Sequence, residues 1–311
     1  MSDTQLTYTA GPEDQDTFLR DILYTRLLLS HSLVVRLKHQ HKIKVNGCTA
    51  RTNCPIHPGD FISIDLDFTE ESKIIPEYIP LDIVYEDEDF LVVNKPAGIS
   101  THPSRKGGTG TLANAVTYYW QSLGKTSLFR PINRLDRDTS GLILIGKSHF
   151  AHQGLFNQKK CRILERRYIA LVEGAMAKDK DCIDQPIARP DDKLRKRIVD
   201  PDGYPAVTHY QVLEKYPEHT LLSLRLETGR THQIRVHLSF LGHPICGDLL
   251  YGSVSPLIAR QALHADRLRF IHPRSGKEII LEIPMAKDME KAVHHLTKLE
   301  LHQHVYHLIK T

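Results

Sequence analysis

Short apolar segments typical of β-strands outnumber helical segments from residue 83 onward in this chain of 311 residues. The segments with strand character are residues 83–85, 90–93, 141–146, 163–172, 207–213, 221–226, 268–271 and 279–283. Helical character is seen at residues 112–123, 150–160 and 231–241, and residues 299–311 fit a peripheral helix or a loose tail. Strands and helices do not alternate regularly, which argues against a doubly wound fold. We therefore expect an α+β domain around a mainly antiparallel, mixed sheet.

A smaller unit precedes this domain. Apolar residues recur at helical spacing between Phe18 and Leu37, and the Ser30 side chain can cap the start of a second helix. Residues 43–47 and 58–66 each combine a strand pattern with a turn that contains glycine. The pattern predicts two short helices and a short sheet. The expected division is a flexible N-terminus over residues 1–12, the small unit over 13–69, an acidic linker over 70–82 and the main domain over 83–311.

Charge is distributed unevenly along the chain. The 41 Lys and Arg residues exceed the 37 Asp and Glu residues by only four, too few to indicate a nucleic-acid partner by themselves. Residues 20–51, however, hold seven basic residues and one acid, Asp21, whereas residues 70–89 hold eight acids and one lysine. The basic character is therefore local to the N-terminal unit.

Residues 131–142 form the most informative motif. A carboxylate, Asp136, follows Arg134-Leu135 and stands between basic residues, just ahead of the apolar run 142–145. A nearby guanidinium can hold such a carboxylate ionised, and an apolar wall keeps water from competing with a substrate. A carboxylate in this setting can act as a nucleophile. Taken alone, the same residues also fit a solvated turn with weak surface ion pairs.

Three further segments occur in a fixed order with this motif. They are Lys95-Pro96-Ala97-Gly98, residues 167–174 around Tyr168, and residues 228–238 around Arg235, which precede the Gly242–Asp248 stretch. Together the four segments resemble the motifs of the RluA family of pseudouridine synthases. That family normally has histidine where Asn133 stands and a lysine where Arg166 and Arg167 precede Tyr168. The resemblance implies the pseudouridine synthase fold, with a central cleft for RNA.

The resemblance also implies a reaction. A uridine already in RNA is detached from its sugar, the base turns while it is held, and the base is reattached through a ring carbon without any cofactor. Asp136 is implied as the catalytic carboxylate, acting on the sugar or on the base, whereas Asp138 is not, because the family's carboxylate directly follows Arg-Leu. Tyr168 is implied to stack on the target base, and Arg235 to pair with Asp136. Arg134 is implied to fill the space that the extruded uridine leaves.

These assignments predict a geometry. Asp136, Tyr168 and Arg235 should converge in one cleft, with Arg134 at its mouth. Residues 231–241 should form a short helix with Ile234, Leu238 and Leu241 facing inward and Arg230 near its start. Without the resemblance, the tyrosine is more typical of an amphipathic strand and the arginine of an exposed helix face.

Residues 13–69 resemble the S-four-type RNA-binding module, which is named for a ribosomal protein. The resemblance implies that Arg36, Lys38, Lys42 and Lys44 neutralise RNA phosphates, although the same cations also fit the solvated side of a helix. The module favours large-subunit ribosomal RNA among the family's targets, while some members act on transfer RNA. A second basic cluster, Arg195, Lys196 and Arg197, fits a solvated loop or the wall of an RNA approach.

The remaining expectations come from features that the sequence lacks. Its five cysteines are not spaced as a disulfide framework or a zinc site, and His232 and His237 do not share a helix face as paired metal ligands do. Neither a signal-peptide profile nor a membrane-length apolar run is present. We expect a cytoplasmic, monomeric enzyme that uses no cofactor or metal, binds RNA and does not bind membranes.

Two other classes of function stay open. One is a non-catalytic RNA-binding or ribosome-assembly protein with the same fold, in which Asp136 would be buried without Arg235 nearby. The other is a hydrolase that pairs Asp136 with a histidine, but the chain has neither a Gly-x-Ser-x-Gly elbow nor a phosphate-binding Gly-rich loop.

Overall fold

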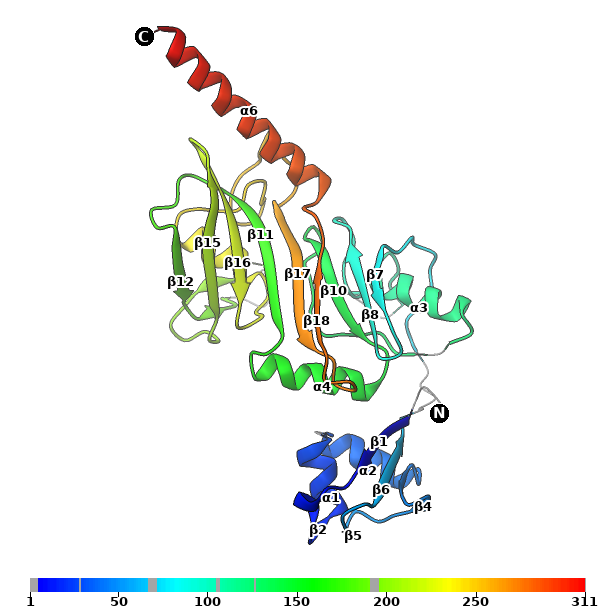
Figure 1. Ribbon diagram of the computed structural model, residues 1–311. Helices are drawn as coiled ribbons and strands as arrows, with labels where there is room; N and C mark the ends of the chain where they lie inside the picture. Colours follow the sequence, from blue (N-terminus) through cyan, green and yellow to red (C-terminus); the bar gives the residue numbers. More distant parts are fainter. Residues whose placement is uncertain are drawn as a thin grey trace.

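The computed structural model describes residues 5–27, 29–66, 72–104, 107–125, 127–190 and 196–310, which form a small N-terminal module and a large sheet domain (Figure 1). The module contains β1 (Gln5–Thr9), η1 (Pro12–Asp14), β2 (Thr17–Phe18), α1 (Leu19–Asp21), the π-helical turn η2 (Ile22–Arg26), α2 (His31–His39), β3 (Ile43–Val45), β4 (Cys48–Thr49), β5 (Pro55–Ile56) and β6 (Phe61–Asp65). The strands of the large domain are β7 (Ile83–Glu86), β8 (Phe90–Lys95), β9 (Arg130–Pro131), β10 (Ser140–Gly146), β11 (Glu165–Glu173), β12 (Lys180–Asp184), β13 (Ile187–Ala188), β14 (Ile198–Val199), β15 (Val207–Lys215), β16 (His219–Leu226), β17 (Leu263–Ile271) and β18 (Glu278–Glu282). Its helices are α3 (Leu112–Ser122), α4 (His149–Lys160), α5 (Gln233–Phe240) and α6 (Lys287–Lys310).

Ten strands of the large domain form one sheet in the order β12-β15-β16-β11-β17-β10-β8-β7, with β18 beside β17 and β9 beside β10. The pairing of β10 with β17 is parallel, and the other pairings in this sheet are antiparallel. The expected α+β fold with a mainly antiparallel, mixed sheet is therefore confirmed.

The parallel pairing depends on one glycine. Strand β10 is buried along its whole length, and Gly141 at its start lies opposite Ala265 of β17. Gly141 has a φ of +114°, and a Cβ atom there would lie 2.2 Å from the backbone oxygen of Ala265. Only glycine fits such an approach without a shift of the backbone.

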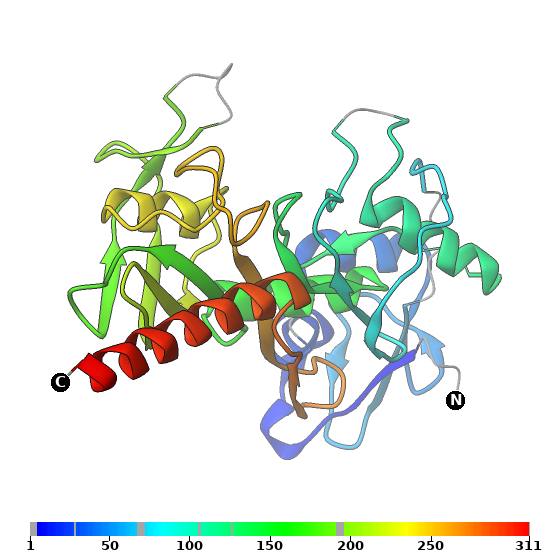
Figure 2. The same ribbon diagram turned by 90° about the horizontal axis from the view of Figure 1, so that it is seen from above.

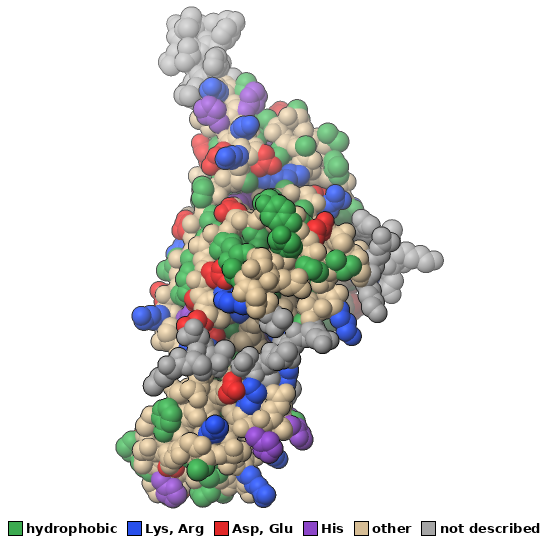
Figure 3. Space-filling model, turned by 90° about the vertical axis from the view of Figure 1, so that its right-hand side faces the viewer, with side chains coloured by type: hydrophobic (Ala, Val, Ile, Leu, Met, Phe, Trp, Pro, Cys, Tyr) green, Lys and Arg blue, Asp and Glu red, His purple; other side chains and the backbone are tan. Residues whose placement is uncertain are grey.

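The helices surround this sheet. Helix α4 lies across the end that faces the N-terminal module, and α6 leaves the domain at the opposite end (Figures 1 and 2). The first turns of α6 are anchored because Met289, Ala292 and Leu296 pack into the main core. Hydrophobic side chains gather on the face of the large domain shown in Figure 3. The exposed side chains of Tyr78 and Tyr118 meet edge to face.

The N-terminal module has its own small sheet, in the order β1-β6-β3-β4. The start of α2 agrees with the sequence, since the Ser30 side chain accepts a hydrogen bond from the Leu33 amide. The expectation of a flexible segment over residues 1–12 is wrong for residues 5–9, because β1 pairs with β6 along its length. Residues 1–4 lie outside the described residues.

Two contacts join the module to the large domain. Phe150 of α4 is buried in the module's hydrophobic core. Arg274 donates to the Gln5 carbonyl at 3.0 Å and binds Asp89 through two guanidinium nitrogens. The position of the module relative to α4 is therefore fixed by both apolar packing and polar contacts.

Two local expectations need correction. Strand β17 begins at Leu263, five residues before the expected start, because the polar residues of its first half are buried against neighbouring strands. In α5, Ile234 and Leu238 face inward as expected, but Leu241 lies just after the helix and is 38% exposed.

Candidate active site

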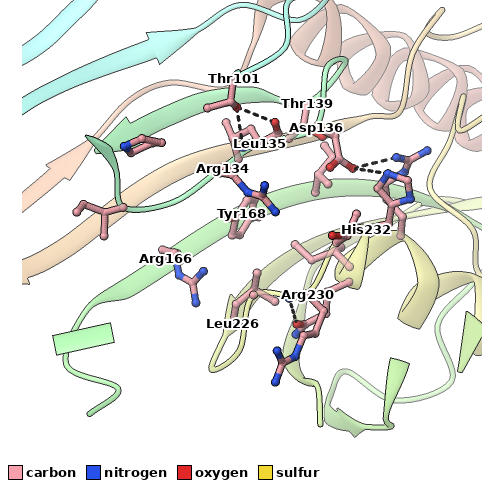
Figure 4. Close-up of a pocket in the computed structure, with 18 of the residues that line it drawn as sticks. Thr101, Arg134, Leu135, Asp136, Thr139, Arg166, Tyr168, Leu226, Arg230 and His232 are labelled. Carbon is pink, nitrogen blue, oxygen red and sulfur yellow. Dashed lines mark hydrogen bonds and ion pairs between the residues drawn. The ribbon is translucent and has the colours of Figure 1, made fainter. Parts of the chain in front are cut away.

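A cavity of about 570 Å³ opens on one face of the large sheet. Its walls come from the loop before β10, from β11, β16 and β17, from α4, and from the segment that leads into α5 (Figure 4). Asp136, Tyr168, Arg235 and Arg134 all line it, so the residues that the sequence predicts to converge do share one cavity.

Several hydrogen bonds hold the loop that carries Asp136 in place. The Thr101 hydroxyl donates to the Leu135 carbonyl at 2.9 Å and accepts from the Leu135 amide at 3.3 Å. The Arg137 side chain donates to the Gly98 carbonyl, and the Gly98 amide donates back to the Arg137 carbonyl. The segment around Lys95–Gly98 therefore supports the loop that carries Asp136. This contact gives a physical reason why the two motifs occur together in the sequence.

Lys95 adds a charge beneath this loop. Its side chain is fully buried, and its ammonium group donates to the carbonyls of Pro96, Ile99 and Arg137 at 2.8, 2.9 and 3.0 Å. Burial lowers the pKa of Lys95 to about 7, and the negative charge of Asp138 opposes this shift. Three carbonyl acceptors allow the ammonium to remain in this position.

Asn133 has a structural position. It is buried, donates to the Leu142 carbonyl at 3.0 Å and accepts from the Leu144 amide at 2.9 Å. Its side chain therefore extends the hydrogen bonding of β10 and fixes the start of the loop. Asn133, which stands where the family normally has histidine, therefore supports the loop that carries Asp136.

Arg235 links two carboxylates. Its Nη1 atom donates to Asp136 Oδ2 at 2.9 Å, while Nε and Nη2 donate to the two oxygens of Asp248 at 2.6 and 2.8 Å. Burial alone would lower the pKa of Arg235, but hydrogen bonds and charge from Asp248, together with Asp136, raise it above its ordinary value. The guanidinium is therefore a permanent cation that holds the Asp136 carboxylate in place.

His232 approaches the same carboxylate from the other side. The Tyr251 hydroxyl oxygen accepts from the Arg197 amide at 2.7 Å and lies 2.9 Å from His232 Nδ1. Donation from this hydroxyl to Nδ1 would place the His232 hydrogen on Nε2, which lies 3.7 Å from Asp136 Oδ2 (Figure 4). Burial lowers the pKa of His232, and the charge of Asp136 opposes this only in part.

The backbone at His232 is unusual. This residue stands just before α5 with a φ of +58°, in the left-handed region that a histidine rarely adopts. Such strain persists only where surrounding contacts maintain it, and here the contact is with Tyr251.

Tyr168 is directed into the cavity from β11 and is 4% exposed. Burial raises the pKa of its phenol, and the charge of Arg166 opposes the shift. The phenol is therefore protonated at neutral pH, with its ring on the cavity wall beside Leu226 (Figure 4). A flat aromatic wall of this kind suits a planar base.

The cavity also has a strongly basic side. Arg134, Lys159, Arg166 and Arg230 line it, and Arg134 is exposed to solvent. Among the described residues, no carboxylate lies within ion-pair distance of any of these four. Asp136 is thus the one acidic residue among those that line the described cavity.

The basic residues predicted on the N-terminal module have different surroundings. Lys38 and Lys44 are exposed, while Lys42 forms an ion pair with Asp65 at 2.9 Å. Arg36 is half-buried toward the large domain: burial lowers the pKa of Arg130 in β9 to about 10, and the charge of Arg36 adds to that shift. The module is thus basic both on its surface and at its junction with α4.

The second basic cluster is partly described. Arg195 lies outside the described residues, whereas Lys196 lies over the Tyr251 ring, 5.6 Å from its centroid, and the Arg197 amide binds the Tyr251 hydroxyl. These two residues therefore border the His232 side of the cavity.

In the described part of the chain, no group of three or more His, Cys, Asp or Glu side chains is arranged to hold a metal ion. In the same residues, none of the helices combines the length and the apolar character needed to cross a bilayer.

Several residues of the site carry no role in the sequence interpretation. Asp248 stands at the end of a motif among apolar neighbours, and a buried aspartate needs a cationic partner, so this signal was available. Tyr251 and Lys159 give no such signal, because their neighbours in the cavity are distant in sequence.

Comparison with known proteins agrees with this geometry. Residues 89–240 match the family model described as RNA pseudouridylate synthase. The chain is 44% identical over 281 residues to a protein of Bacillus subtilis named uncharacterized RNA pseudouridine synthase YhcT, covering 89% of this chain and 93% of that one. It is 40% identical over 249 residues to the ribosomal large subunit pseudouridine synthase D of Escherichia coli O6:H1, covering 76% of each.

Solved structures show the same fold. The human RNA pseudouridylate synthase domain containing 1 superposes with a TM-score of 0.55 at 30% identity, over 66% of this chain and 83% of that one. The human RNA pseudouridylate synthase domain containing 4 superposes with a TM-score of 0.58 at 24% identity, over 70% of this chain and 93% of that one.

Proposed function

The chain belongs to the RluA family of RNA pseudouridine synthases and is therefore an isomerase, and we propose that it converts uridine to pseudouridine in large-subunit ribosomal RNA with Asp136 as the catalytic carboxylate. The observation that carries the catalytic assignment is the 2.9 Å hydrogen bond from Arg235 to Asp136 within the cavity that Tyr168 also lines. A non-catalytic protein has no need for an anion held in this way beside an aromatic wall.

The reaction requires the bond between the base and the sugar to break and a new bond to form from a ring carbon of the same base. The ionised Asp136 carboxylate acts as nucleophile or base in this exchange, on the sugar or on the uracil ring. Arg235 holds it in place through a hydrogen bond of 2.9 Å, and the Tyr168 ring supports the base while it turns. The ring carbon that bonds to the sugar loses a proton, and the ring nitrogen that left the sugar gains one, so the exchange balances without any external group.

Arg134 acts at the mouth of the cavity. Its exposed cationic side chain projects from the Asp136 loop, where it replaces the uridine in the base stack. Extrusion of a base costs a few kcal/mol, which a planar cation in the vacancy offsets in part.

The choice of ribosomal RNA rests on relatives and on the module. Two relatives named ribosomal large subunit pseudouridine synthase D, from Haemophilus ducreyi and Escherichia coli, are 37% and 40% identical. The exposed Lys38 and Lys44 are suited to phosphates of a structured RNA, while Arg36 and Lys42 place further positive charge on the module. A synthase acting on transfer RNA is the alternative.

The test combines a variant with a map of pseudouridine. Asp136→Asn keeps the side-chain volume but removes the anion, so it should abolish pseudouridine formation and leave folding and RNA affinity nearly unchanged. Asp138→Asn is the matched control, since it removes a carboxylate two residues away that does not line the cavity. Cells that lack the protein should lose specific pseudouridines from large-subunit ribosomal RNA, and wild type should restore them. Turnover by the Asp136 variant would refute the catalytic assignment, and losses confined to transfer RNA would refute the target.

A further inference from the structure

The basic side of the cavity contains a buried guanidinium with an unused donor. Arg166 is 4% exposed, its Nη2 atom donates to the Thr228 carbonyl at 3.1 Å, and its buried Nε atom has no hydrogen-bond partner. The neighbouring loop has a glycine at the position closest to this guanidinium, since a Cβ atom at Gly229 would lie 2.9 Å from Arg166 Nη1. Within the described residues this guanidinium therefore makes one hydrogen bond, and it lines the cavity with donor capacity left for an acceptor that enters there.

Lys159 lies beside this guanidinium. Within the described residues, its ammonium group donates one long hydrogen bond, of 3.3 Å, to the Ile132 carbonyl. Burial lowers the pKa of Lys159 to about 8, and the charges of Arg166, Arg134 and Arg230 add to the shift. Four cations around one space, without a carboxylate at ion-pair distance, repel one another unless an anion enters.

Helix α4 also presents an aromatic residue on the same wall. His152, Phe156 and Lys159 are spaced by four and three residues, which puts them on one helix face, and all three line the cavity. Phe156 is 52% exposed and stacks with His152 at a centroid distance of 6.3 Å. An exposed ring one turn from two cations is the arrangement that binds single-stranded nucleic acid, by base stacking next to a backbone phosphate.

We propose that Lys159 and Arg166 form a phosphate subsite for the nucleotide next to the target uridine, with Phe156 as the stacking surface for its base. The inference rests on the proposed function, because it is the RNA backbone that would join this phosphate to a uridine at Asp136. The guanidinium supplies planar hydrogen bonds and the ammonium supplies a point charge. The subsite therefore positions the strand at a contact that does not depend on the identity of the base.

The test removes one charge from the protein, at Lys159, and one charge from the RNA, at a loop phosphate. The probe is a stem-loop RNA with a loop made only of uridines, compared with versions in which one loop phosphate at a time is replaced by a neutral methylphosphonate. Binding is measured with the Asp136→Asn protein, so that no turnover occurs, with and without Lys159→Gln. One particular neutral linkage should weaken binding by about tenfold, the size expected for a charged hydrogen bond.

The two changes should not add. With Lys159→Gln present, affinity for the unmodified RNA should already be lower, and that same neutral linkage should then cost clearly less than it does with Lys159 in place, because only the Arg166 contact remains to be lost. Lys159→Arg should restore most of the affinity, and Lys180→Gln, at a residue that does not line the cavity, should behave as the parent protein. Phe156→Ala should weaken binding at every linkage, because a stacking contact does not depend on phosphate charge.

Additive losses at all linkages, or unchanged affinity with Lys159→Gln, would overturn the subsite, and so would a failure of this protein to bind the loop RNA. Pseudouridine formation by wild type on its natural RNA is measured separately. If that activity is present and the losses add, only the subsite fails. If the losses do not add and no pseudouridine forms, the proposed function fails.

Discussion

Asp248 holds the guanidinium of Arg235 by two hydrogen bonds, of 2.6 and 2.8 Å, and so directs its third nitrogen toward Asp136. Asp248 is fully buried, and one of its oxygens also accepts from the amides of Leu250 and Tyr251. The direction of the Asp136 carboxylate is therefore set by a residue that does not line the cavity.

Asp248→Asn should lower kcat on the order of 100-fold, because Arg235 loses its orientation while Asp136 remains. The KM for RNA should change much less, since RNA does not contact Asp248 directly. The unfolding free energy should fall by about 3 kcal/mol, because a buried pair is broken. Steady-state kinetics and denaturant unfolding measure these effects, with Asp181→Asn in a surface pair with Lys178 as the control. An unchanged kcat would contradict the positioning role.

In Tyr251→Phe, the hydrogen of neutral His232 should no longer be confined to Nε2. The tyrosine hydroxyl fixes the tautomer of His232, and its loss should lower kcat by about fivefold to tenfold, the cost of one hydrogen bond in the network. Nitrogen NMR of His232 should show the change of tautomer directly. Tyr210→Phe removes a buried hydroxyl elsewhere in the core and should leave both measurements unchanged. A wild-type spectrum with the hydrogen on Nδ1 would contradict the assigned network.

RNA binding should weaken as pH rises from 7 to 8.5. The pKa of Lys159 is lowered to about 8 in the free protein, and a bound phosphate raises it, so binding takes up a proton in this range. Over this range the affinity of the wild type for RNA should fall severalfold more than the affinity of Lys159→Arg, because the arginine keeps its charge. Burial lowers the pKa values of His102 and His152 on the same walls, so these two histidines are neutral throughout this range. Identical pH dependence in the two proteins would contradict the prediction.

Gly141→Ala should destabilise the large domain by about 2 to 4 kcal/mol, because the added Cβ meets the backbone of Ala265 and the positive φ disfavours alanine. Thermal and denaturant unfolding measure this change. Gly276→Ala, in a hairpin turn with positive φ but open space around it, isolates the conformational cost. A similar loss in both variants would show that the close approach of β10 and β17 contributes nothing.

Neutralising the exposed lysines of the N-terminal module should flatten the salt dependence of RNA binding. Lys38→Gln and Lys44→Gln should each lower the slope of log affinity against log salt by about 0.7 to 0.9 if each contacts one phosphate. Lys42→Gln should have a smaller effect, since Asp65 already pairs with that charge. Turnover at saturating RNA should be unchanged in all three variants. Unchanged salt slopes for both exposed lysines would assign the module another role.

The amino-acid sequence by itself determined the class of fold, most of the strands and helices, and the motif that carries Asp136. These features follow from periodicity and from residue types at short spacing, which act within a few residues. It also identified Tyr168 and Arg235 as residues of the same site, through a resemblance that covers four ordered segments. Local pattern did not reveal β1, whose short strand is stabilised by pairing with β6 more than 50 positions away.

Only the tertiary structure decided how these parts meet. Arg235 donates hydrogen bonds to both Asp136 and Asp248, which come from separate loops. The position of the hydrogen on His232 and the unpaired Nε of Arg166 likewise depend on groups that are distant in sequence. The physical reason is that direction, burial and local charge arise from neighbours in space, and side chains 99 positions apart in sequence become neighbours only when the sheet is assembled.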